Sequence, residues 1–568
     1  MKEKIIKKTK KLLKLTPNLT DYEKAYKSFS WKSGEKEISW FSGKKLNAAY
    51  NALDRHALGL RKNKIALYWH GENGQKQSFT FWDLYLLSNQ FGNFLKSLGV
   101  KKGEKVFFFL PRIPELYWGF LGTLKIGAVA GTLFAAFGPQ ALYDRLKNSG
   151  VKIIITNKAL YPRLAKIEKY LPDLKKIVLA ENITNLLNRY SVKLRCKPMA
   201  PTEPAFILYT SGTTGKPKGV VHTHQAILLQ HLTAKWVLDI KENDTYWCTA
   251  DPGWITGIAY NILGTWSNGV STLVYEGRFD PKKWYQLIQD YQVTVWYTAP
   301  TAIRMLAAAG EKLVKKYDFS SLRHLASVGE PLNPEAVWWG MKAFGLPFHD
   351  NWWQTETGGI LIANYPCMDI KPGSMGKPIP GIVAEIVDNH GKKLPKGEIG
   401  NLAIKPPWPS LMKTIWRRPQ KYKSYFINDW YITGDLAYKD KDGYFWFVGR
   451  ADDVIKTSGE RIGPFEVESS LLEHPAVVEA GVIGKPDPLR GEIVKAFVVL
   501  KKGWKPSEKL KEKLQQHVKT HLAGHAYPRE IEFIDKLPKT RSGKIVRRIL
   551  KAKELGLPIG DTSTLEEY

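Results

Sequence analysis

The chain has 568 residues, of which 43% are hydrophobic, and it carries a formal net charge of +31. This length and apolar content exclude a disordered chain and suggest about three to four domain-sized units. The cysteines Cys196, Cys248 and Cys367 are too widely spaced for a disulfide scaffold or a zinc finger. They favour a reducing compartment, and we therefore expect a cytoplasmic protein.

The first 15 residues, MKEKIIKKTKKLLKL, predict a lysine-rich helix exposed to solvent, or otherwise a helix on a membrane surface. They are too polar for the core of a signal peptide, and they lack the arginine and serine of a transit peptide. The longest apolar run, residues 126–137, falls short of the roughly 18 residues that a membrane span needs. We therefore expect no membrane-spanning segment.

Positive charge is concentrated in the first 200 residues, which hold 37 Lys and Arg against 14 Asp and Glu. The rest of the chain holds 48 against 40. A basic region of this kind is compatible with nucleic acid, an anionic membrane or anionic small molecules as partners. Composition alone does not distinguish among the three.

Apolar runs typical of strands alternate with helical patterns through the first half of the chain. The expected strands are residues 105–110, 152–156, 177–180, 205–209, 272–275 and 293–297. The expected helices are residues 114–124 and 223–238, the second with Thr223 as its N-cap. This alternation predicts an α/β fold with parallel sheets.

From about residue 382 the pattern changes to short strands and turns. Strands are expected at residues 383–387, 400–404, 430–438 and 444–448. A small α/β pattern then returns, with strands at 479–483, 494–500 and 530–534 and helices at 507–521 and 542–555. The sequence therefore predicts a large domain, residues 1–450, and a small domain, residues 451–568.

The segment Tyr209–Gly219, YTSGTTGKPKG, directly follows a predicted strand. Its glycines permit close approach to the backbone, its hydroxyls donate hydrogen bonds, and its two lysines are positively charged, which suits a polyphosphate. Gly212 and Gly215 are too close together for a Walker A loop. From composition alone, the segment is equally well a turn rich in glycine, serine and threonine.

This segment resembles the phosphate loop of the adenylate-forming superfamily, which includes acyl-CoA synthetases, luciferases and peptide-synthetase adenylation domains. The further motifs of the superfamily follow in order: GEP at 329–331, DNWWQTETG at 350–358, YITGD at 431–435, GRADD at 449–453, KTSGER at 456–461 and PKTRSGK at 538–544. The resemblance implies a large, multi-layer N-terminal adenylation domain with parallel-rich sheets and a small, mobile C-terminal α/β domain.

The same resemblance implies an ATP and AMP site. Its residues are Thr210, Ser211, Gly212, Thr213, Thr214, Gly215, Lys216, Gly329, Glu330, Pro331, Asp350, Asn351, Trp352, Trp353, Gln354, Thr355, Asp435, Arg450 and Arg461. We expect Asp435 to accept both ribose hydroxyls, and the guanidinium of Arg461 to face phosphate oxygens. Without the family, Asp435 is interpreted as a cap of the turn after Gly434.

Lys544 is the catalytic residue that the resemblance implies. When a carboxylate attacks the α-phosphorus of ATP, two anions meet, and a mobile ammonium group offsets the charge that builds. From pattern alone, the segment around Lys544 is a basic amphipathic helix at the surface or against nucleic acid. The family also implies that Asp452 is the hinge of the small domain, and that reversible acetylation of Lys544 stops the first step.

Two cation sites and a CoA site are also implied by the family. Mg²⁺ is expected at Glu356, and a second cation at Leu472, His474 and Val477, where the two apolar residues contribute only carbonyl oxygens. His474 is otherwise an ordinary histidine at the end of a helix. The expected CoA contacts are Thr256, Ser458, Gly459 and Lys519, although a lysine on an exposed helix needs no special explanation.

Trp353 decides which acid is expected. In the family this position lines the acyl pocket, here together with Ile255, Thr256 and Val328, and an indole shortens the pocket to acetate. Steric closure is needed because one methylene contributes only about 1–3 kcal/mol to discrimination. The alternative for Trp353, one of 20 tryptophans, is ordinary core packing. We therefore expect a ligase that forms acetyl-CoA, AMP and pyrophosphate from acetate, ATP and CoA, with propionate or another short acid as the alternative substrate.

A binding protein for nucleic acid or an anionic membrane is the rival from another class, but it leaves the ordered motifs unexplained. Because all the expected substrates are anions, we expect no nucleic-acid partner. The basic first 200 residues are instead expected to steer those substrates or to contact the nucleotide end of CoA. Longer members of the family supply such contacts from additional N-terminal sequence, and they carry a histidine at the position of Glu460.

Overall fold

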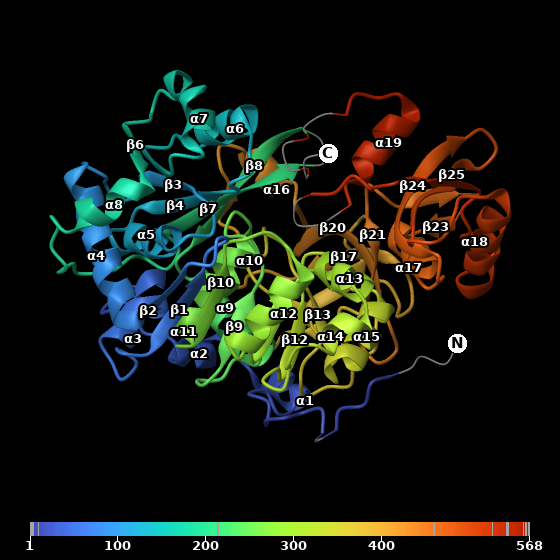
Figure 1. Ribbon diagram of the computed structural model, residues 1–568, viewed down its shortest axis with the longest axis horizontal. Helices are drawn as coiled ribbons and strands as arrows, with labels where there is room; N and C mark the ends of the chain where they lie inside the picture. The colour runs from blue at the N-terminus through green and yellow to red at the C-terminus, as the bar shows by residue number, and fades with distance from the viewer. Residues whose placement is uncertain are drawn as a thin grey trace.

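The computed structural model describes residues 5–9, 11–212, 215–457, 460–524, 526–540, 545–559, 562 and 565. Four sheets organise these residues (Figure 1). Three sheets lie before residue 451, which we call the large part, and the fourth belongs to the small part after it.

The first sheet has a parallel centre. Its strand order is β15 (Lys377–Pro378), β14 (Ile362–Ala363), β13 (Phe348–Trp352), β12 (His324–Ser327), β11 (Val295–Thr298), β9 (Thr245–Cys248), β10 (Ser271–Tyr275), β1 (Ile65–His70) and β2 (Lys76–Thr80). The six strands from β13 to β1 are parallel, and the short edge strands are antiparallel. Since neighbouring parallel strands end at the same edge, residues that follow β12 and β13 lie close together.

The second sheet carries the hairpin of the predicted phosphate loop. Its strand order is β18 (Thr414–Ile415), β8 (Gly215–Thr223), β7 (Pro204–Gly212), β4 (Val129–Leu133), β3 (Lys105–Phe109), β5 (Ile153–Thr156) and β6 (Lys176–Leu179). The strands from β7 to β6 are parallel, whereas β7 and β8 form an antiparallel hairpin.

The third sheet is antiparallel. It contains β16 (Ala384–Val387), β17 (Gly400–Ile404), β20 (Trp430–Lys439), β19 (Phe426–Ile427) and β21 (Phe445–Arg450). The fourth contains β23 (Glu460–Ile462), β22 (Ile455–Thr457), β25 (Gly491–Leu500), β24 (Val477–Asp487) and β26 (Glu530–Phe533), the last parallel to β25.

Helices connect and cover these sheets. The longer helices of the large part are α4 (Phe81–Ser97), α5 (Pro114–Lys125), α6 (Pro139–Ser149), α8 (Ala180–Leu187), α9 (Ala226–Trp236), α12 (Pro281–Asp290), α13 (Pro300–Ala308) and α15 (Pro334–Phe344). The short ones are α1 (Tyr22–Ser28), α2 (Trp31–Gly34), α3 (Arg55–Ala57), α7 (Tyr161–Ala165), α10 (Ile255–Ile258), α11 (Gly264–Ser267), α14 (Glu311–Val314) and α16 (Pro419–Lys423). The small part has α17 (Pro464–Leu472), α18 (Glu508–His521) and α19 (Arg547–Leu555). Helical turns of other types cover residues 35–37, 50–54, 168–170 and 259–263.

The expected α/β fold with parallel-rich sheets is confirmed. One apolar core joins the three sheets of the large part, and the small part has a separate core. In Figure 1 the small part, with β24, β25, α17 and α18, lies at one side of the large part, with α17 beside β21. The boundary between residues 450 and 451 stays a prediction. None of the described helices has the length and hydrophobicity needed to cross a lipid bilayer.

The predicted N-cap of α9 is wrong. Thr223 is the last residue of β8, where it pairs with Pro204, and the N-cap of α9 is Gln225. The pairing keeps Thr223 in the extended hairpin, so the helix starts only after a further turn. Here a long-range strand pair overrides the local capping preference.

The predicted N-terminal helix is also wrong for the part of it that the structure describes. Residues 5–9 and 11–18, here called the terminal strap, contain no helix and lie along the large part. The backbone of Ile6 forms a β-bridge with Ile370, and Lys7 forms an ion pair with Asp369 at 2.7 Å. Tertiary partners for the backbone and for the lysines therefore outweigh helix propensity.

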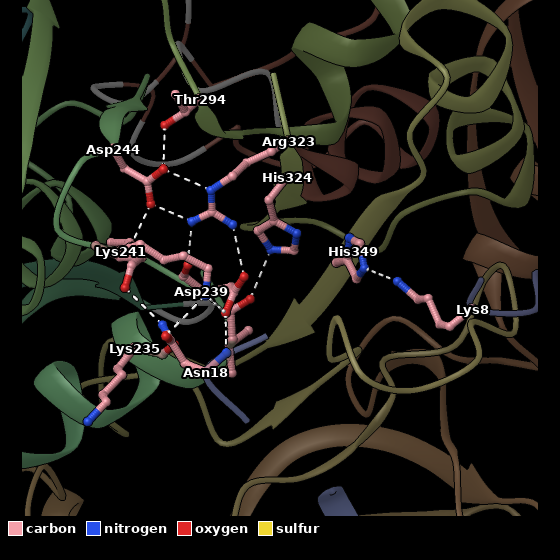
Figure 2. Close-up of polar contacts among 12 residues, drawn as sticks. Lys8, Asn18, Lys235, Asp239, Lys241, Asp244, Thr294, Arg323, His324 and His349 are labelled. Atoms are coloured by element: carbon pink, nitrogen blue, oxygen red, sulfur yellow. Dashed lines mark hydrogen bonds and ion pairs between the residues drawn. The ribbon is translucent and has the colours of Figure 1, made fainter. Parts of the chain in front are cut away.

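Figure 2 shows the side chains that hold the terminal strap. Lys8 Nζ contacts the ring of His349, and the backbone N–H of Asn18 donates to Asp239 at 2.7 Å. Asp239 in turn pairs with Arg323 at 2.8 Å. Because burial removes water, it lowers the pKa of Lys8 to about 7, against the opposing effects of Cys367, Asp369 and Asp239.

Candidate active site

The β7–β8 hairpin presents the predicted phosphate loop at one end of the second sheet. Thr210 pairs with Lys218, and Gly212 with Gly215, so the two strands are held up to the turn. Thr213 and Thr214 lie outside the described residues, and so do the side chains of Ser211 and Lys216. The buried hydroxyl of Thr210 has no hydrogen-bond partner among the described residues.

Lys218 and Glu356 form a buried ion pair beside this hairpin. Lys218 Nζ lies 2.6 Å from Glu356 Oε1 and also donates to the hydroxyl of Tyr425, which contacts the same carboxylate at 3.4 Å. Burial alone would raise the pKa of Glu356, but the nearby ammonium outweighs burial and lowers it. Glu356 is therefore an ionised carboxylate, which is the type of ligand that Mg²⁺ prefers.

Asp435 is the centre of a second polar cluster. It lies on β20, opposite Arg450 on β21, and Arg450 Nη1 donates to Asp435 Oδ1 at 2.7 Å. Trp352 Nε1 and Gln354 Nε2 each donate to Asp435 Oδ2 at 2.9 Å. Burial alone would lower the pKa of Arg450, but Asp435 raises it above its ordinary value.

This second cluster brings four predicted nucleotide residues together from three strands and a turn. Three of the four lone pairs of the Asp435 carboxylate are used by these donors, and the one that remains, on Oδ1, can still accept from a sugar hydroxyl. The hydroxyl of Tyr431 orients Gln354 by donating to its Oε1 at 3.0 Å. The result is an acceptor whose position is fixed by contacts within the protein itself.

The turn after β13 holds Thr355 and Glu356 in place. The ring of His222 donates to the carbonyl of Thr355 at 2.8 Å, and Thr357 Oγ1 accepts from the backbone N–H of Gln354 at 2.9 Å. Gly358 has a φ of +74°, and a Cβ there would lie 2.2 Å from the carbonyl oxygen of Ser410. Only glycine fits that position, so the turn is specified by its sequence.

The predicted adenine segment, residues 329–331, follows β12. Glu330 accepts from Arg304 and from Thr301, both at 2.8 Å, so its side chain is tied to α13. Asp350 is buried on β13, where burial raises its pKa well above the ordinary value of an aspartate, and its Oδ1 has no hydrogen-bond partner among the described residues. These residues lie at the common edge of β12 and β13, as parallel pairing requires.

Among the residues predicted for the acyl pocket, Trp353 is surrounded by aromatic side chains. Ile255 and Val328 are buried in the large core, and Trp353 is partly exposed at its margin. The indole N–H of Trp353 donates to the hydroxyl of Tyr297 at 3.3 Å. Tyr260 packs against the indole in a T-shape, with ring centroids 5.2 Å apart. Trp353 is therefore not a wholly buried core residue, and its role as a wall of the acyl pocket stays a prediction.

The small part meets the large part close to the adenine segment. Asn333 donates to the hydroxyl of Ser469 on α17 at 2.6 Å, and the rings of Phe447 and Phe465 pack with centroids 6.1 Å apart. Oδ1 of Asp452, the predicted hinge residue, lies 3.7 Å from Nε of Arg450. A pocket between the two parts is lined by acidic and basic residues, among them Arg304, Glu330, Glu468, Glu479, Lys539 and Arg547.

Several residues predicted for the ATP, CoA and catalytic sites belong to the small part, and most of them lie outside the described residues. Lys544, Ser458 and Gly459 are outside them, as is the side chain of Arg461 on β23. Lys519 lies on α18 with its ammonium 5.6 Å from the ring centre of Tyr527.

The second cation site, expected at Leu472, His474 and Val477, stays a prediction. His474 follows α17 and accepts from the backbone N–H of Ala476 at 3.2 Å. No group of three histidine, cysteine or acidic side chains within the described ranges is arranged to hold a metal. A site built from the carbonyl oxygens of Leu472 and Val477 is a different kind of site, and this finding does not test it.

Some residues of the candidate site were missed by sequence reasoning. Lys218 belongs to the phosphate-loop motif, so its position in that motif was a usable signal. Tyr425, Tyr260, Tyr297 and Arg304 lie in segments without a recognisable motif. Only the fold brings them to Glu356, Trp353 and Glu330.

Comparisons with known proteins agree with this geometry. A family model described as "AMP-binding enzyme" matches residues 53–416, and one described as "AMP-binding enzyme C-terminal domain" matches residues 466–544. The two matches together include most of the large part and most of the small part.

Two relatives are similar over almost their whole length. An acetyl-coenzyme A synthetase of Bacillus subtilis (strain 168) is 56% identical over 562 residues, covering 97% of this chain and 98% of the relative. An acetyl-coenzyme A synthetase of Methanothrix thermoacetophila is 43% identical over 564 residues, covering 93% and 86%.

Two crystal structures share the fold. An acyl-CoA synthetase of Brucella canis superposes with a TM-score of 0.74 at 35% identity, covering 95% of this chain and 99% of that one. The anthranilate CoA ligase AuaEII in complex with anthranoyl-AMP gives a TM-score of 0.84 at 32% identity, covering 90% and 97%.

Proposed function

Because the chain belongs to the family of AMP-binding enzymes, the adenylate-forming superfamily, we propose that it is an acetate–CoA ligase that produces AMP. It converts acetate, ATP and CoA to acetyl-CoA, AMP and pyrophosphate. The observation that supports the choice of acetate is the position of the Trp353 indole, which contacts Tyr297 and Tyr260 and which we propose as one wall of the acyl pocket. The names of the two relatives support the same choice.

In the first half-reaction an oxygen of acetate attacks the α-phosphorus of ATP. The new bond is acetyl oxygen to phosphorus, the bond that breaks joins phosphorus to the bridging oxygen, and pyrophosphate leaves. Asp435 accepts from the ribose hydroxyls, and Thr355 and the phosphate loop contact the phosphates. The ammonium group of Lys544 offsets the charge that builds on the phosphoryl oxygens.

Mg²⁺ fits the donor set at Glu356, because the carboxylate is ionised and buried beside the phosphate loop. When bound, the cation neutralises phosphate charge. Lys218 supplies a counter-charge to Glu356, so this buried carboxylate is not an isolated anion. The proposed second cation site at Leu472, His474 and Val477 rests on the family alone.

In the second half-reaction the thiolate of CoA attacks the carbonyl carbon of acetyl-AMP. A carbon–sulfur bond forms, the bond from the acyl carbon to the phosphate oxygen breaks, and AMP leaves. The small domain turns about Asp452 between the two steps, which withdraws Lys544 and admits CoA past Thr256, Ser458 and Gly459. Lys519 is proposed as a contact to a CoA phosphate.

Two further properties follow from this proposal. Acetylation of Lys544 removes its positive charge and therefore stops the first half-reaction. A cytoplasmic location is proposed because the three cysteines are unpaired and the substrates are cytoplasmic metabolites.

The most direct test is a panel of acids in a pyrophosphate-release assay with ATP and Mg²⁺. We expect acetate to have the highest kcat/KM, and propionate to have a value at least about tenfold lower. The indole blocks the space for an extra methylene, and this steric exclusion discriminates more strongly than the transfer free energy of one methylene. A preference for propionate or a longer acid favours the alternative substrate. Salt-dependent binding of a nucleic-acid duplex or of anionic lipid vesicles, without turnover of ATP that depends on an added carboxylic acid, favours the rival interpretation as a binding protein.

A second test is Trp353→Gly, which should admit butyrate or longer acids at the expense of acetate. Trp338→Gly is the matched control, since Trp338 is an exposed tryptophan on α15. An unchanged acid profile in Trp353→Gly removes Trp353 from the pocket.

A further inference from the structure

The indole of Trp353 is held by a chain of hydrogen bonds that starts deep in the first sheet. Tyr297, on β11, is fully buried, and its hydroxyl lies 3.3 Å from the indole nitrogen of Trp353 and 2.8 Å from Asn351 Oδ1. The Nδ2 of Asn351 donates to the carbonyl of Ser327, on β12, at 2.9 Å. The chain thus runs from β12 through β13 to β11 and ends on the indole.

The donors and acceptors in this series of hydrogen bonds are arranged in one direction. Since Asn351 Nδ2 donates to Ser327, its Oδ1 faces Tyr297 and accepts the single hydroxyl proton. The hydroxyl oxygen of Tyr297 is then left as an acceptor, and an indole N–H is only a donor, so the two match. Burial raises the pKa of Tyr297 well above the ordinary value of a tyrosine, so the proton stays in place at neutral pH.

Tyr260 supports the same indole from another direction. Its ring packs edge-on against Trp353, with an interplanar angle of 83°, and it also contacts Tyr297 in a T-shape. Its own hydroxyl is fixed by Thr233 at 2.7 Å and by the backbone N–H of Ile360 at 2.8 Å. One edge of the indole is therefore hydrogen-bonded, and another side is packed against a ring that cannot rotate freely.

We propose that Tyr297 is a positioning residue that sets the chain-length limit for the acid by fixing the indole of Trp353. This inference rests on the proposed function. A wall excludes a longer acid only while it stays closed, and a side chain held by packing alone can move aside for one extra methylene. The Tyr297 hydroxyl supplies the directional contact that keeps the wall in one orientation.

The test compares Tyr297→Phe with the wild-type enzyme, using kcat/KM for acetate and for propionate in the pyrophosphate-release assay. Loss of one hydrogen bond should raise the propionate-to-acetate ratio about three- to tenfold, while the KM for ATP stays within about twofold. Tyr285→Phe is the matched control, because Tyr285 is also fully buried but its hydroxyl has no partner among the described residues. A purely structural effect lowers kcat/KM equally for both acids and leaves the propionate-to-acetate ratio unchanged. That result overturns the proposal.

A double-mutant cycle shows whether Tyr297 acts through Trp353. Trp353→Phe keeps an aromatic wall but removes the N–H donor, so adding Tyr297→Phe to it should leave the acid ratio unchanged. A further rise in the ratio in that background contradicts the proposed route. If Tyr297→Phe does not fold, Trp353 is replaced by 3-benzothienylalanine, which keeps the size of the indole but has no N–H donor, and the proposal requires the ratio to rise as well.

Failure of the proposed function and failure of the proposed role of Tyr297 give different results. If the wild-type enzyme releases no pyrophosphate with any short acid, the proposed function is wrong, and the role of Tyr297 falls with it. If acetate is preferred and the ratio does not respond to Tyr297→Phe, only the role of Tyr297 is wrong.

Discussion

The three sheets of the large part share one apolar core, in which Leu67, Phe108 and Ile404 come from different sheets. The sheet of the small part is built around a core of its own, with Val482, Val498 and Leu514. In the large part the acceptor Asp435 is fixed by three donors from the protein itself. The residue expected to perform the first step, Lys544, belongs instead to the small part.

Under the proposed function, the large part recognises the nucleotide, and the small part supplies the group that acts in the first step. Groups that recognise the nucleotide gain from a rigid surrounding, because order that already exists need not be created on binding. A group that must be present in one step and absent in the next gains from a separate body with its own core. The contact from Asn333 to Ser469 is a single hydrogen bond between neutral groups, which is the kind of contact that a rotation can break and remake.

The largest expected effect comes from removing the lysine of the small part. Lys544→Ala should lower acetyl-AMP formation by about a thousandfold, since an ammonium that stabilises transition-state charge is lost. Thioester formation from supplied acetyl-AMP should stay within about twofold of wild type. The two half-reactions are measured separately, by pyrophosphate release and by acetyl-CoA formation. If both survive, the division of labour between the two parts is wrong.

The next largest effect is expected from Asp435, in the large part. Asp435→Asn should raise the KM for ATP by about ten- to a hundredfold, because hydrogen bonds to a charged acceptor are lost and Arg450 is left without its partner. The effect should appear in both half-reactions as weaker nucleotide binding. Asp388→Asn, in an exposed turn of the third sheet, is the control and should change neither. A drop in kcat with an unchanged KM would show that Asp435 does not act through binding.

A smaller effect tests the charge of the first 200 residues. Replacing four exposed lysines there by glutamine should raise the KM for CoA by about two- to fivefold at low salt and less at high salt, because ions screen long-range attraction. Four exposed lysines of the small part are the matched comparison. An equal, salt-independent change in both variants means that the charge in this region is only solvated surface.

The smallest effect concerns the pH dependence of the terminal strap. Because the folded state lowers the pKa of Lys8 to about 7 from 10.5, the unfolded chain binds more protons at this residue between those values. The contribution of Lys8 to stability therefore rises as the pH increases from about 7 to 10.5. Lys8→Met removes this term, so its Tm should gain about 1–3 °C on the wild type near pH 6.5 and less near pH 9. The exposed Lys11→Met is the control, and a pH-independent difference for Lys8→Met would contradict the shift.

Sequence motifs predicted those parts of the candidate site whose residues lie close together in the sequence. The turn of residues 354–358 and the pair Asp435–Arg450 were predictable because the residues that form them sit in short, recognisable segments. The alternation of strands and helices likewise predicted the parallel sheets, since buried parallel strands are continuous apolar runs.

What the sequence does not show depends on partners far away in the chain. Tyr297 and Trp353 are 56 residues apart, and no pattern links them. Tyr425 reaches Glu356 only because the third sheet packs beside the phosphate hairpin. For the terminal strap, the local pattern of lysines and leucines favours a helix, but Ile370 and Asp369 provide better partners.

The terminal strap also has a consequence for the order of events during synthesis. Lys7 pairs with a residue 362 positions later, so its partner leaves the ribosome long after Lys7 does. At about 5–20 residues per second, the strap waits roughly 20–70 seconds before it can dock. An apolar segment left exposed for that time would invite aggregation, whereas a segment rich in lysine repels its own copies. The charge at this end of the chain thus protects the nascent protein until the first sheet is complete.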